Sequence, residues 1–453
     1  MIESDLVARE SKSARVDRQF HGISRPETPE PMGAAFTWLC TFYLVYCARP
    51  EDWIPGLKYI PLAKISVFFA LIGLAMVGGK SKRKLSELPK EGHYLLALIL
   101  LLFVSAFLSP IWKGGAFFHT LDFAKIYVAW VLTFIVVTDF RKLRRIIFVQ
   151  AASVVAISIV SIAKGYDHPR LEGVLGGIYG NPNDLAFAIV LSLPFCLAFL
   201  VSSKSALVKV AWTLSMLVMA ASLFLTASRA GFIDLVIAGG VCLWHFGIKG
   251  RRMYLIVIAL VFSALLMAVA GKQLKNRFTA MSGEDLNTEI EGKAYGSFEA
   301  RQMLMRRAME EIEHYPILGI GVNNFVSVSG DWHEVHMTYL QIACEGGVFA
   351  FTLYVLFFSR GFSNLRKLRR RQNLDVETVL FVGALHSSLI GFVVGALFAP
   401  EAYQFFPYFA VAYVSVLSAI LDKQVPVPAP IPAQSRVQKY AIQPGPSARV
   451  ARF

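Results

Sequence analysis

The sequence predicts an all-α, polytopic membrane protein with about twelve transmembrane helices and one large loop that itself contains helices. Three observations indicate this fold class. Hydrophobic residues make up 55% of the 453 residues and charged residues only 17%, whereas about a quarter of a soluble domain is charged. Apolar runs long enough to cross a bilayer, roughly 17–25 residues each, recur along the chain. Basic residues concentrate in alternate short connections, as expected of cytoplasmic loops.

The apolar runs give the order of the elements. They lie at 34–48, 62–79, 93–109, 119–138, 144–163, 184–202, 206–226, 230–248, 252–271, 336–359, 379–398 and 404–421. We therefore expect, in order, a polar cytoplasmic tail (1–32), nine transmembrane helices (33–271), the large loop (272–335), three further transmembrane helices (336–421) and a Pro-rich cytoplasmic tail (422–453).

The basic residues set the orientation in the membrane. A cytoplasmic N-terminus places the connections rich in Lys and Arg on the cytoplasmic side, namely 80–90, 139–145, 203–209, 249–252 and 360–371. The short connections on the opposite, outer side carry few basic residues. The net charge of +14 is then explained by attraction to anionic membrane lipids at the inner face, and nucleic acid is not expected as a partner.

The first outward segment with polar residues is GGIYGNPNDLAF, residues 176–187. Asn181 has the residue type that caps a helix, Pro182 suits the first turn, and Asp184 follows the cap by three residues. One interpretation is that the segment only begins a transmembrane helix. The other is that Asn183 and Asp184 also line a polar pocket at the outer surface.

The second outward segment is LTASRAGF, residues 225–232, between two apolar runs. Thr226 and Ser228 are possible caps for the helix that follows. A helix N-terminus already carries partial positive charge, so Arg229 is unfavourable there unless an anion joins it. Because the arginine fork matches phosphate oxygens, the segment predicts an anion site at Arg229. The alternative is that Arg229 only reaches toward lipid headgroups.

The large loop contains a predicted amphipathic helix over residues 296–316, ended by Pro316. Arg301 shares one face of this helix with Met305, Ala308 and Ile312, because they recur at steps of four, three and four. A cation at the head of an apolar stripe suggests a second bound anion. The alternative is a salt bridge from Arg301 to a glutamate of the same helix, such as Glu299 or Glu310.

The last segment is DWHEVHMTYLQIACEGG, residues 331–347. Its histidines are three residues apart, so the H-E-x-x-H zinc motif is absent, and without a third ligand no metal site is expected. His336 lies at the outer end of an apolar run, where its surroundings could set its pKa for removing a proton from a hydroxyl. The alternative is an interfacial histidine that only forms hydrogen bonds.

The order of these motifs resembles the O-antigen ligase and O-antigen polymerase superfamily over roughly residues 170–360. The resemblance rests on GNPND opening one span, T-x-S-R-x-G between two later spans, an arginine on a loop helix, HYPILGIGVNNF, and HMTYLQIACEGG opening a span. It implies that Arg229 and Arg301 hold the donor's diphosphate and that His336 activates the acceptor hydroxyl. Members often have Asn after that histidine, where this chain has Met337, so His333 competes for the role.

The resemblance also implies an activity. A glycan would pass from undecaprenyl diphosphate to a hydroxyl of lipid A–core, another glycan or a protein, with inversion and without a metal or other cofactor. The reaction would take place on the periplasmic face of a bacterial inner membrane. Glu345 matches an acidic residue common in the E-x-G segment of the family. The sequence leaves open a polymerase, a protein O-oligosaccharyltransferase and, from a different class, a transporter of lipid-linked sugars.

Overall fold

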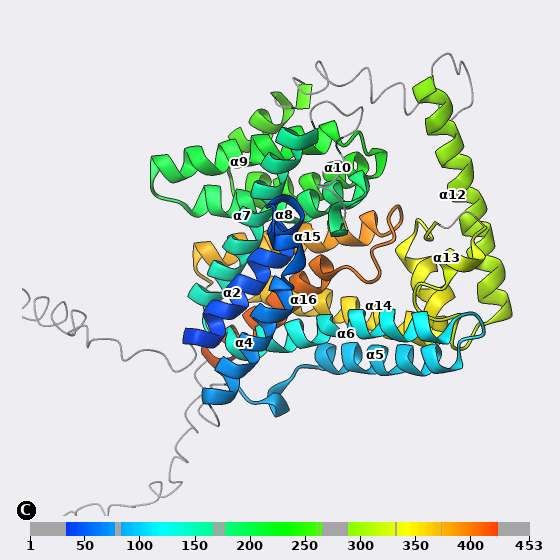
Figure 1. The fold of residues 1–453 in the computed structure, drawn as a ribbon. Coiled ribbons are helices and arrows are strands. Elements are labelled where there is room, and N and C mark those ends of the chain that lie inside the picture. The colour runs from blue at the N-terminus through cyan, green and yellow to red at the C-terminus, as the bar shows by residue number, and fades with distance from the viewer. Residues whose placement is uncertain are drawn as a thin grey trace, which may run out of the picture.

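The architecture comes from a computed structural model, which describes residues 33–77, 83–165, 171, 177–261, 263–264, 289–330, 333–372 and 374–424. All regular secondary structure in these ranges is helical, which confirms the all-α prediction (Figure 1). Nine helices of the described chain are long and apolar enough to cross a membrane, and two shorter apolar helices, α2 and α4, precede them. The chain is therefore a polytopic membrane protein. Both expected tails, except for a few residues, lie outside the described ranges.

The helices follow the predicted apolar runs. Their bounds are α2 (Gly33–Ala48), α3 (Pro50–Trp53), α4 (Leu62–Val77), α5 (Lys90–Leu108), α6 (Lys113–Val136), α7 (Phe140–Gly165), α8 (Pro182–Ser202), α9 (Ala206–Leu225), α10 (Arg229–Leu243), α12 (Glu289–His314), α13 (Phe325–Val328), α14 (Thr338–Arg370), α15 (Val376–Gly395) and α16 (Phe405–Gln424). A π-turn, Trp244–Ile248, prolongs α10. The run 252–271 lies only partly within the described residues, where 254–261 and 263–264 are helical.

Helix α14 extends eleven residues beyond the predicted run 336–359. Its last turn carries Lys367, Arg369 and Arg370, and basic side chains there interact favourably with the negative end of the helix dipole. The prediction from hydrophobicity ended this helix at residue 359, where the apolar run ends, although the helix continues to Arg370.

The helices α8, α15 and α16 are the most deeply buried of the candidate membrane spans. They are apolar on all sides, as expected of helices surrounded by others. Some buried polar groups are paired between helices: the Tyr43 hydroxyl lies 2.9 Å from the Thr133 hydroxyl, and the Tyr413 hydroxyl donates to Gln150 Oε1 at 2.6 Å. Such pairing is needed where no water is available to satisfy polar groups.

Helix α12 runs across one end of the bundle, whereas α5, α6 and α14 lie alongside one another (Figure 1). There α12 contacts α14. The buried side of α12 includes Ala308, which packs in a small cluster with Leu304, Ile320, Phe325 and others. The apolar face predicted for the loop helix is thus the face turned toward the protein.

Candidate functional site

The glycine-rich segment before α13 pairs with the first turns of α14. The Ile320 N–H donates to the Cys344 carbonyl at 3.0 Å, and the Gly321 N–H donates to the Glu345 carbonyl at 2.9 Å. These carbonyls are accessible because α14 is interrupted at Gly347, whose φ is 75° and ψ −178°. The two sequence motifs HYPILGIGVNNF and ACEGG therefore form one structural unit.

Two glycines permit this close approach. A Cβ at Gly347 would lie 2.2 Å from the Ile317 carbonyl oxygen, and one at Gly319 would lie 2.5 Å from the Cys344 carbonyl oxygen. Both glycines also have positive φ angles, which L side chains rarely adopt. Only glycine fits both the space and the backbone conformation.

Hydroxyl groups at the end of α5 fix the same segment from the other side. Ser109 donates to the Ile320 carbonyl at 2.6 Å, and Asn324 donates to the Ser109 hydroxyl at 2.8 Å. Ser105 donates to the Glu345 carbonyl at 3.2 Å. The segment that leads into the histidines is therefore held rigidly by α5 and α14.

The side chain of Glu345 serves the same unit. It is buried, 1% exposed. Its carboxyl group accepts hydrogen bonds from the backbone N–H groups of Asn323 and Phe325 and faces the Tyr403 hydroxyl. These contacts place Glu345 under the glycine-rich segment. Glu345, which matched an acidic residue of the family's E-x-G segment and was a possible pocket residue, therefore has the position of a structural anchor.

The connection between α15 and α16 docks on the start of α14. The Thr338 N–H donates to the Ala396 carbonyl at 2.8 Å, and its hydroxyl donates to the Ala399 carbonyl at 2.6 Å. That hydroxyl in turn accepts from the Glu401 N–H at 2.9 Å. Glu401 is thereby brought to the segment that carries the histidines, although more than sixty residues separate them in the sequence.

The starts of α8 and α10 are joined by side chains. Asn181 Oδ1 accepts from the Asn183 N–H at 2.9 Å, so the predicted cap of α8 is confirmed. The Ser228 hydroxyl accepts from the Gly231 N–H at 3.0 Å, which caps α10, and donates to Asn183 Oδ1 at 2.6 Å. The predicted pocket residue Asn183 therefore links α8 to the motif that carries Arg229. Arg229 is the first residue of α10 and is half-buried.

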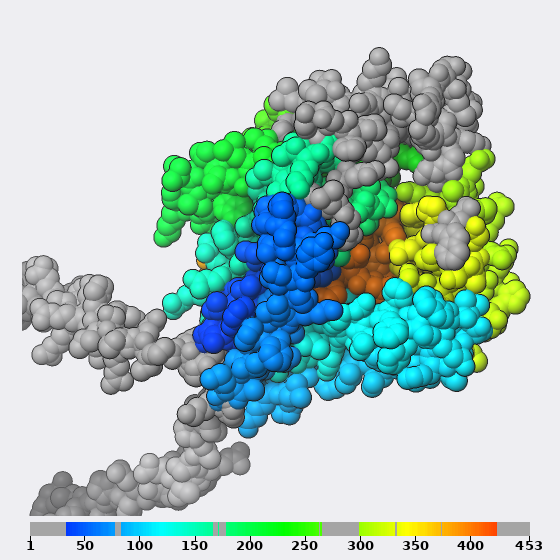
Figure 2. Space-filling view, in the orientation of Figure 1, coloured from blue at the N-terminus to red at the C-terminus, as the bar shows by residue number. Residues whose placement is uncertain are grey.

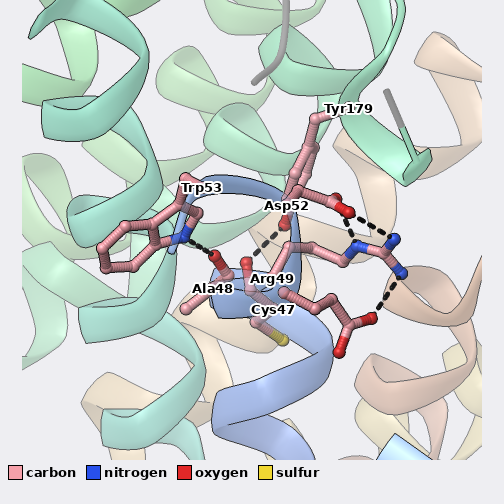
Figure 3. Close-up of polar contacts among 7 residues, drawn as sticks. Cys47, Ala48, Arg49, Asp52, Trp53 and Tyr179 are labelled. Carbon is pink, nitrogen blue, oxygen red and sulfur yellow. Dashed lines mark hydrogen bonds and ion pairs between the residues drawn. The ribbon is translucent and has the colours of Figure 1, made fainter. Parts of the chain in front are cut away.

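A hydrogen bond just before the start of α8 connects this segment to the end of α2 (Figure 3). The Tyr179 hydroxyl donates to the Cys47 carbonyl at 2.7 Å, which ties the GGIYGNPND segment to the end of α2. Arg49 has a φ of 48° and binds Asp52 at 2.7 Å and Glu51 at 3.2 Å. The charge of Arg49 is therefore balanced by two neighbouring carboxylates.

Arg301 is coupled electrostatically to His336. Burial lowers the pKa of the Arg301 guanidinium, and its Nε has no hydrogen-bond partner among the described residues. Within those residues Arg301 makes no ion pair, and Glu310 binds Arg307 instead at 3.2 Å. Burial, the Arg301 charge and His333 lower the pKa of His336 from 6.5 to about 4, so its imidazole is neutral near pH 7.

Glu334, which lies between the two histidines in the sequence, is coupled electrostatically to carboxyl groups of other elements. Glu334 interacts electrostatically with Asp184 at the start of α8, with Glu345 and with Glu401. Burial and the negative charges of Asp184, Glu334 and Asp234 raise the pKa of Glu401 well above its usual range. One Glu401 oxygen, Oε1, is buried without a hydrogen-bond partner in the described part of the chain.

Figure 2 shows a hollow on one face of the molecule. It is bordered by blue residues of the N-terminal helices, the cyan helices α5 and α6, and the yellow segment around α13, and orange residues of the C-terminal part of the chain are visible at its floor. Within the described residues, no three His, Cys, Asp or Glu side chains are grouped as possible metal ligands.

The structure joins the predicted residues in two sets. Asn183 is linked to the Arg229 motif, and Arg301 interacts with His336; the electrostatic coupling of Asp184 to Glu334 connects the sets. Sequence reasoning missed Glu334 and Glu401. The signal available for Glu334 was its place between two histidines, whereas Glu401 is a lone acid in a connection and gave none.

One family model matches part of the chain. The model of the O-antigen ligase family matches residues 214–355, a range that includes Arg229, Arg301 and His336. The match confirms the resemblance to the O-antigen ligase superfamily and supports glycosyltransferase activity in a membrane protein. No curated protein matches the chain.

Proposed function

We propose that this chain, with its O-antigen ligase region, moves a glycan from undecaprenyl diphosphate to an acceptor hydroxyl of lipid A–core or a similar molecule. The reaction inverts the anomeric carbon and needs no metal. It takes place on the periplasmic face of a bacterial inner membrane, with both termini of the chain in the cytoplasm. The observation that carries the proposal is the half-buried Arg301, which has a buried Nε without a hydrogen-bond partner and no ion pair in the described residues, and which is coupled electrostatically to the neutral imidazole of His336.

Arg301 has the properties of an anion site. A buried cation without a counter-ion is costly, and a diphosphate would supply both the missing charge and hydrogen-bond acceptors for the guanidinium. Arg229 stands at the first position of α10, where backbone N–H groups and the helix dipole also favour an anion. The two arginines would hold the diphosphate and stabilise the negative charge that develops on it as the glycan leaves.

His336 has the protonation state of a base. Its neutral imidazole would accept the proton of the acceptor hydroxyl while that oxygen attacks the anomeric carbon. The new C–O bond forms as the bond from the anomeric carbon to the diphosphate oxygen breaks, and undecaprenyl diphosphate leaves. The positive charge of Arg301 is one cause of the lowered pKa of His336. A bound diphosphate would offset that charge, so donor binding would strengthen the base.

The first experiment uses the purified full-length protein in proteoliposomes with an undecaprenyl-diphosphate-linked glycan and lipid A–core. We expect wild-type protein to transfer the glycan and His336→Ala to be slower by about 10²–10⁴-fold, the usual range for a general base. His314→Ala is the matched control, because His314 is exposed and bonds only a carbonyl of its own helix. Equal rates for His336→Ala and His314→Ala would refute the assignment and would favour His333.

The second experiment distinguishes the ligase from a polymerase of the same superfamily. We would compare the surface glycans of a deletion strain with those of the strain complemented by wild type. Long chains that are lost from lipid A–core and accumulate on the lipid carrier indicate a ligase. A collapse to single repeat units indicates a polymerase, and a modified protein acceptor indicates an O-oligosaccharyltransferase.

A further inference from the structure

Two histidines and an arginine from three helices form a chain of hydrogen bonds far from the candidate site. Nη1 of Arg369, in the last turn of α14, lies 3.2 Å from Nε2 of His386 in α15. Nδ1 of His386 lies 2.9 Å from Nε2 of His245, in the π-turn that prolongs α10. An α-helix rises about 1.5 Å per residue, so Arg229 and His245 are separated by roughly 24 Å, most of the thickness of a bilayer core. The chain therefore lies toward the opposite membrane face from Arg229.

The backbone is shaped to bring these side chains together. The π-turn carries His245, and such turns are frequent at functional sites. A Cβ at Gly383 of α15 would lie 3.1 Å from the His245 Cβ, so the absence of a side chain there lets His245 pack closely on α15. Phe362 of α14 meets the His386 ring edge-on, with ring centroids 6.3 Å apart. The described residues offer no third ligand that would make the two histidines a metal site.

The direction of the hydrogen bonds sets the charge of this group. A guanidinium can only donate, so His386 accepts at Nε2 and carries its proton on Nδ1. That N–H donates to Nε2 of His245, whose own proton is then on Nδ1. Both imidazoles are therefore neutral. They hold the Arg369 guanidinium in place without balancing its positive charge.

No carboxylate in the described chain balances that charge either. Arg369 makes no ion pair with a described residue, and neither does Lys249. Lys249 follows His245 by four residues and interacts electrostatically with both imidazoles. Acidic side chains at this end bind other cations, namely Glu377 with Arg144, Asp422 with Arg371 and Glu87 with Lys423. The result is a group of cations without a protein counter-ion.

An exposed apolar surface adjoins these cations. Trp244 and Ile248 of the π-turn are 50% and 46% exposed, and tryptophan is enriched at the level of the lipid headgroups. Lys249 and Arg369 belong to the basic connections 249–252 and 360–371, which the sequence predicts to be cytoplasmic. A soluble anion would use only the cations. A lipid would use both features, because its phosphate meets the cations and its acyl chains lie on Trp244 and Ile248.

We propose that Arg369 and Lys249 bind the phosphate of an anionic lipid headgroup in the membrane leaflet opposite the candidate site. The guanidinium has further N–H donors beside the one that His386 accepts, and its planar fork matches phosphate oxygens. Basic groups between membrane helices on the cytoplasmic side are typical sites for acidic headgroups. The bound lipid connects the ends of α10 and α14 at α15 and so stabilises their packing. The site shares no residue with the proposed glycan transfer and does not depend on it.

The test is a lipid titration of the purified full-length protein in dodecyl maltoside micelles, followed by the midpoint of thermal unfolding. We expect phosphatidylglycerol to raise the midpoint, and phosphatidylcholine with the same acyl chains or sodium phosphate to leave it unchanged. Arg369→Gln and Lys249→Gln each remove one cation. Each should raise the mole fraction of phosphatidylglycerol that gives half of the stabilisation about fivefold, the effect of one basic residue at an anionic membrane surface. Lys249→Gln leaves the hydrogen-bond chain intact, so it decides the matter even if Arg369→Gln does not fold.

The matched control is Arg366→Gln, which makes the same change of charge at an exposed position one turn earlier on α14. Its titration should coincide with that of the wild type. An equal weakening by Arg366→Gln and Lys249→Gln would show only general attraction between charges and would overturn the proposal. Stabilisation by sodium phosphate alone would identify a soluble anion in place of a lipid. A wild-type protein that responds equally to phosphatidylglycerol and phosphatidylcholine would refute the site.

Discussion

Replacement of Ser228 by alanine tests how the fold positions Arg229. The Ser228 hydroxyl is buried and makes two hydrogen bonds, one from the Gly231 N–H and one to Asn183 Oδ1. Loss of a helix cap costs about 0.5–2 kcal/mol, and a buried acceptor left without its donor costs about 1–3 kcal/mol. We therefore expect Ser228→Ala to lower the free energy of unfolding by roughly 1.5–5 kcal/mol.

The chain offers a matched control for this change. Ser205 also precedes a helix, α9, but its side chain makes no cap hydrogen bond and is exposed. Unfolding by sodium dodecyl sulfate in mixed micelles gives the free energies of both variants. A loss for Ser228→Ala no larger than that for Ser205→Ala would refute the reasoning. Because Arg229 follows directly, we also expect Ser228→Ala to raise the KM for the lipid-linked donor.

Three further predictions concern backbone, donor and metal. Gly347→Ala should destabilise the protein by at least about 2 kcal/mol, since its Cβ would lie 2.2 Å from the Ile317 carbonyl oxygen at a φ of +75°. Gly239→Ala, inside α10 with nothing within 4 Å, should not destabilise the protein in the same titration, because alanine favours a helix over glycine. Arg301→Lys keeps the charge but loses the planar fork of the guanidinium, so the KM for the donor should rise about tenfold. Arg307→Lys, a change on the exposed side of α12, should leave this KM unchanged. Equal KM values for the two variants would contradict a diphosphate at Arg301. A chelator should leave the transfer rate unchanged, and loss of transfer with rescue by a divalent cation would disprove metal independence.

Much of the fold could be predicted because each helix is specified locally. An apolar run longer than the bilayer core must be helical, since the backbone has no other way to satisfy its hydrogen bonds in lipid. Local chemistry also predicted the caps at Asn181 and Ser228 and the apolar face of α12 around Ala308. The extent of α14 was less predictable, because its last turns lie beyond the apolar run and are stabilised by charge.

Part of the candidate site could likewise be predicted from the sequence, and part of it could not. The sequence by itself indicated Arg229, Arg301 and His336, because each residue is chemically unusual in its own short segment. Only the tertiary structure showed that Glu334 is coupled to Asp184 and Glu401, since contacts between distant elements leave no periodic signal in the chain. The pKa of His336 was likewise decided by the fold, because burial and the charge of Arg301 come from residues that the local sequence does not bring together.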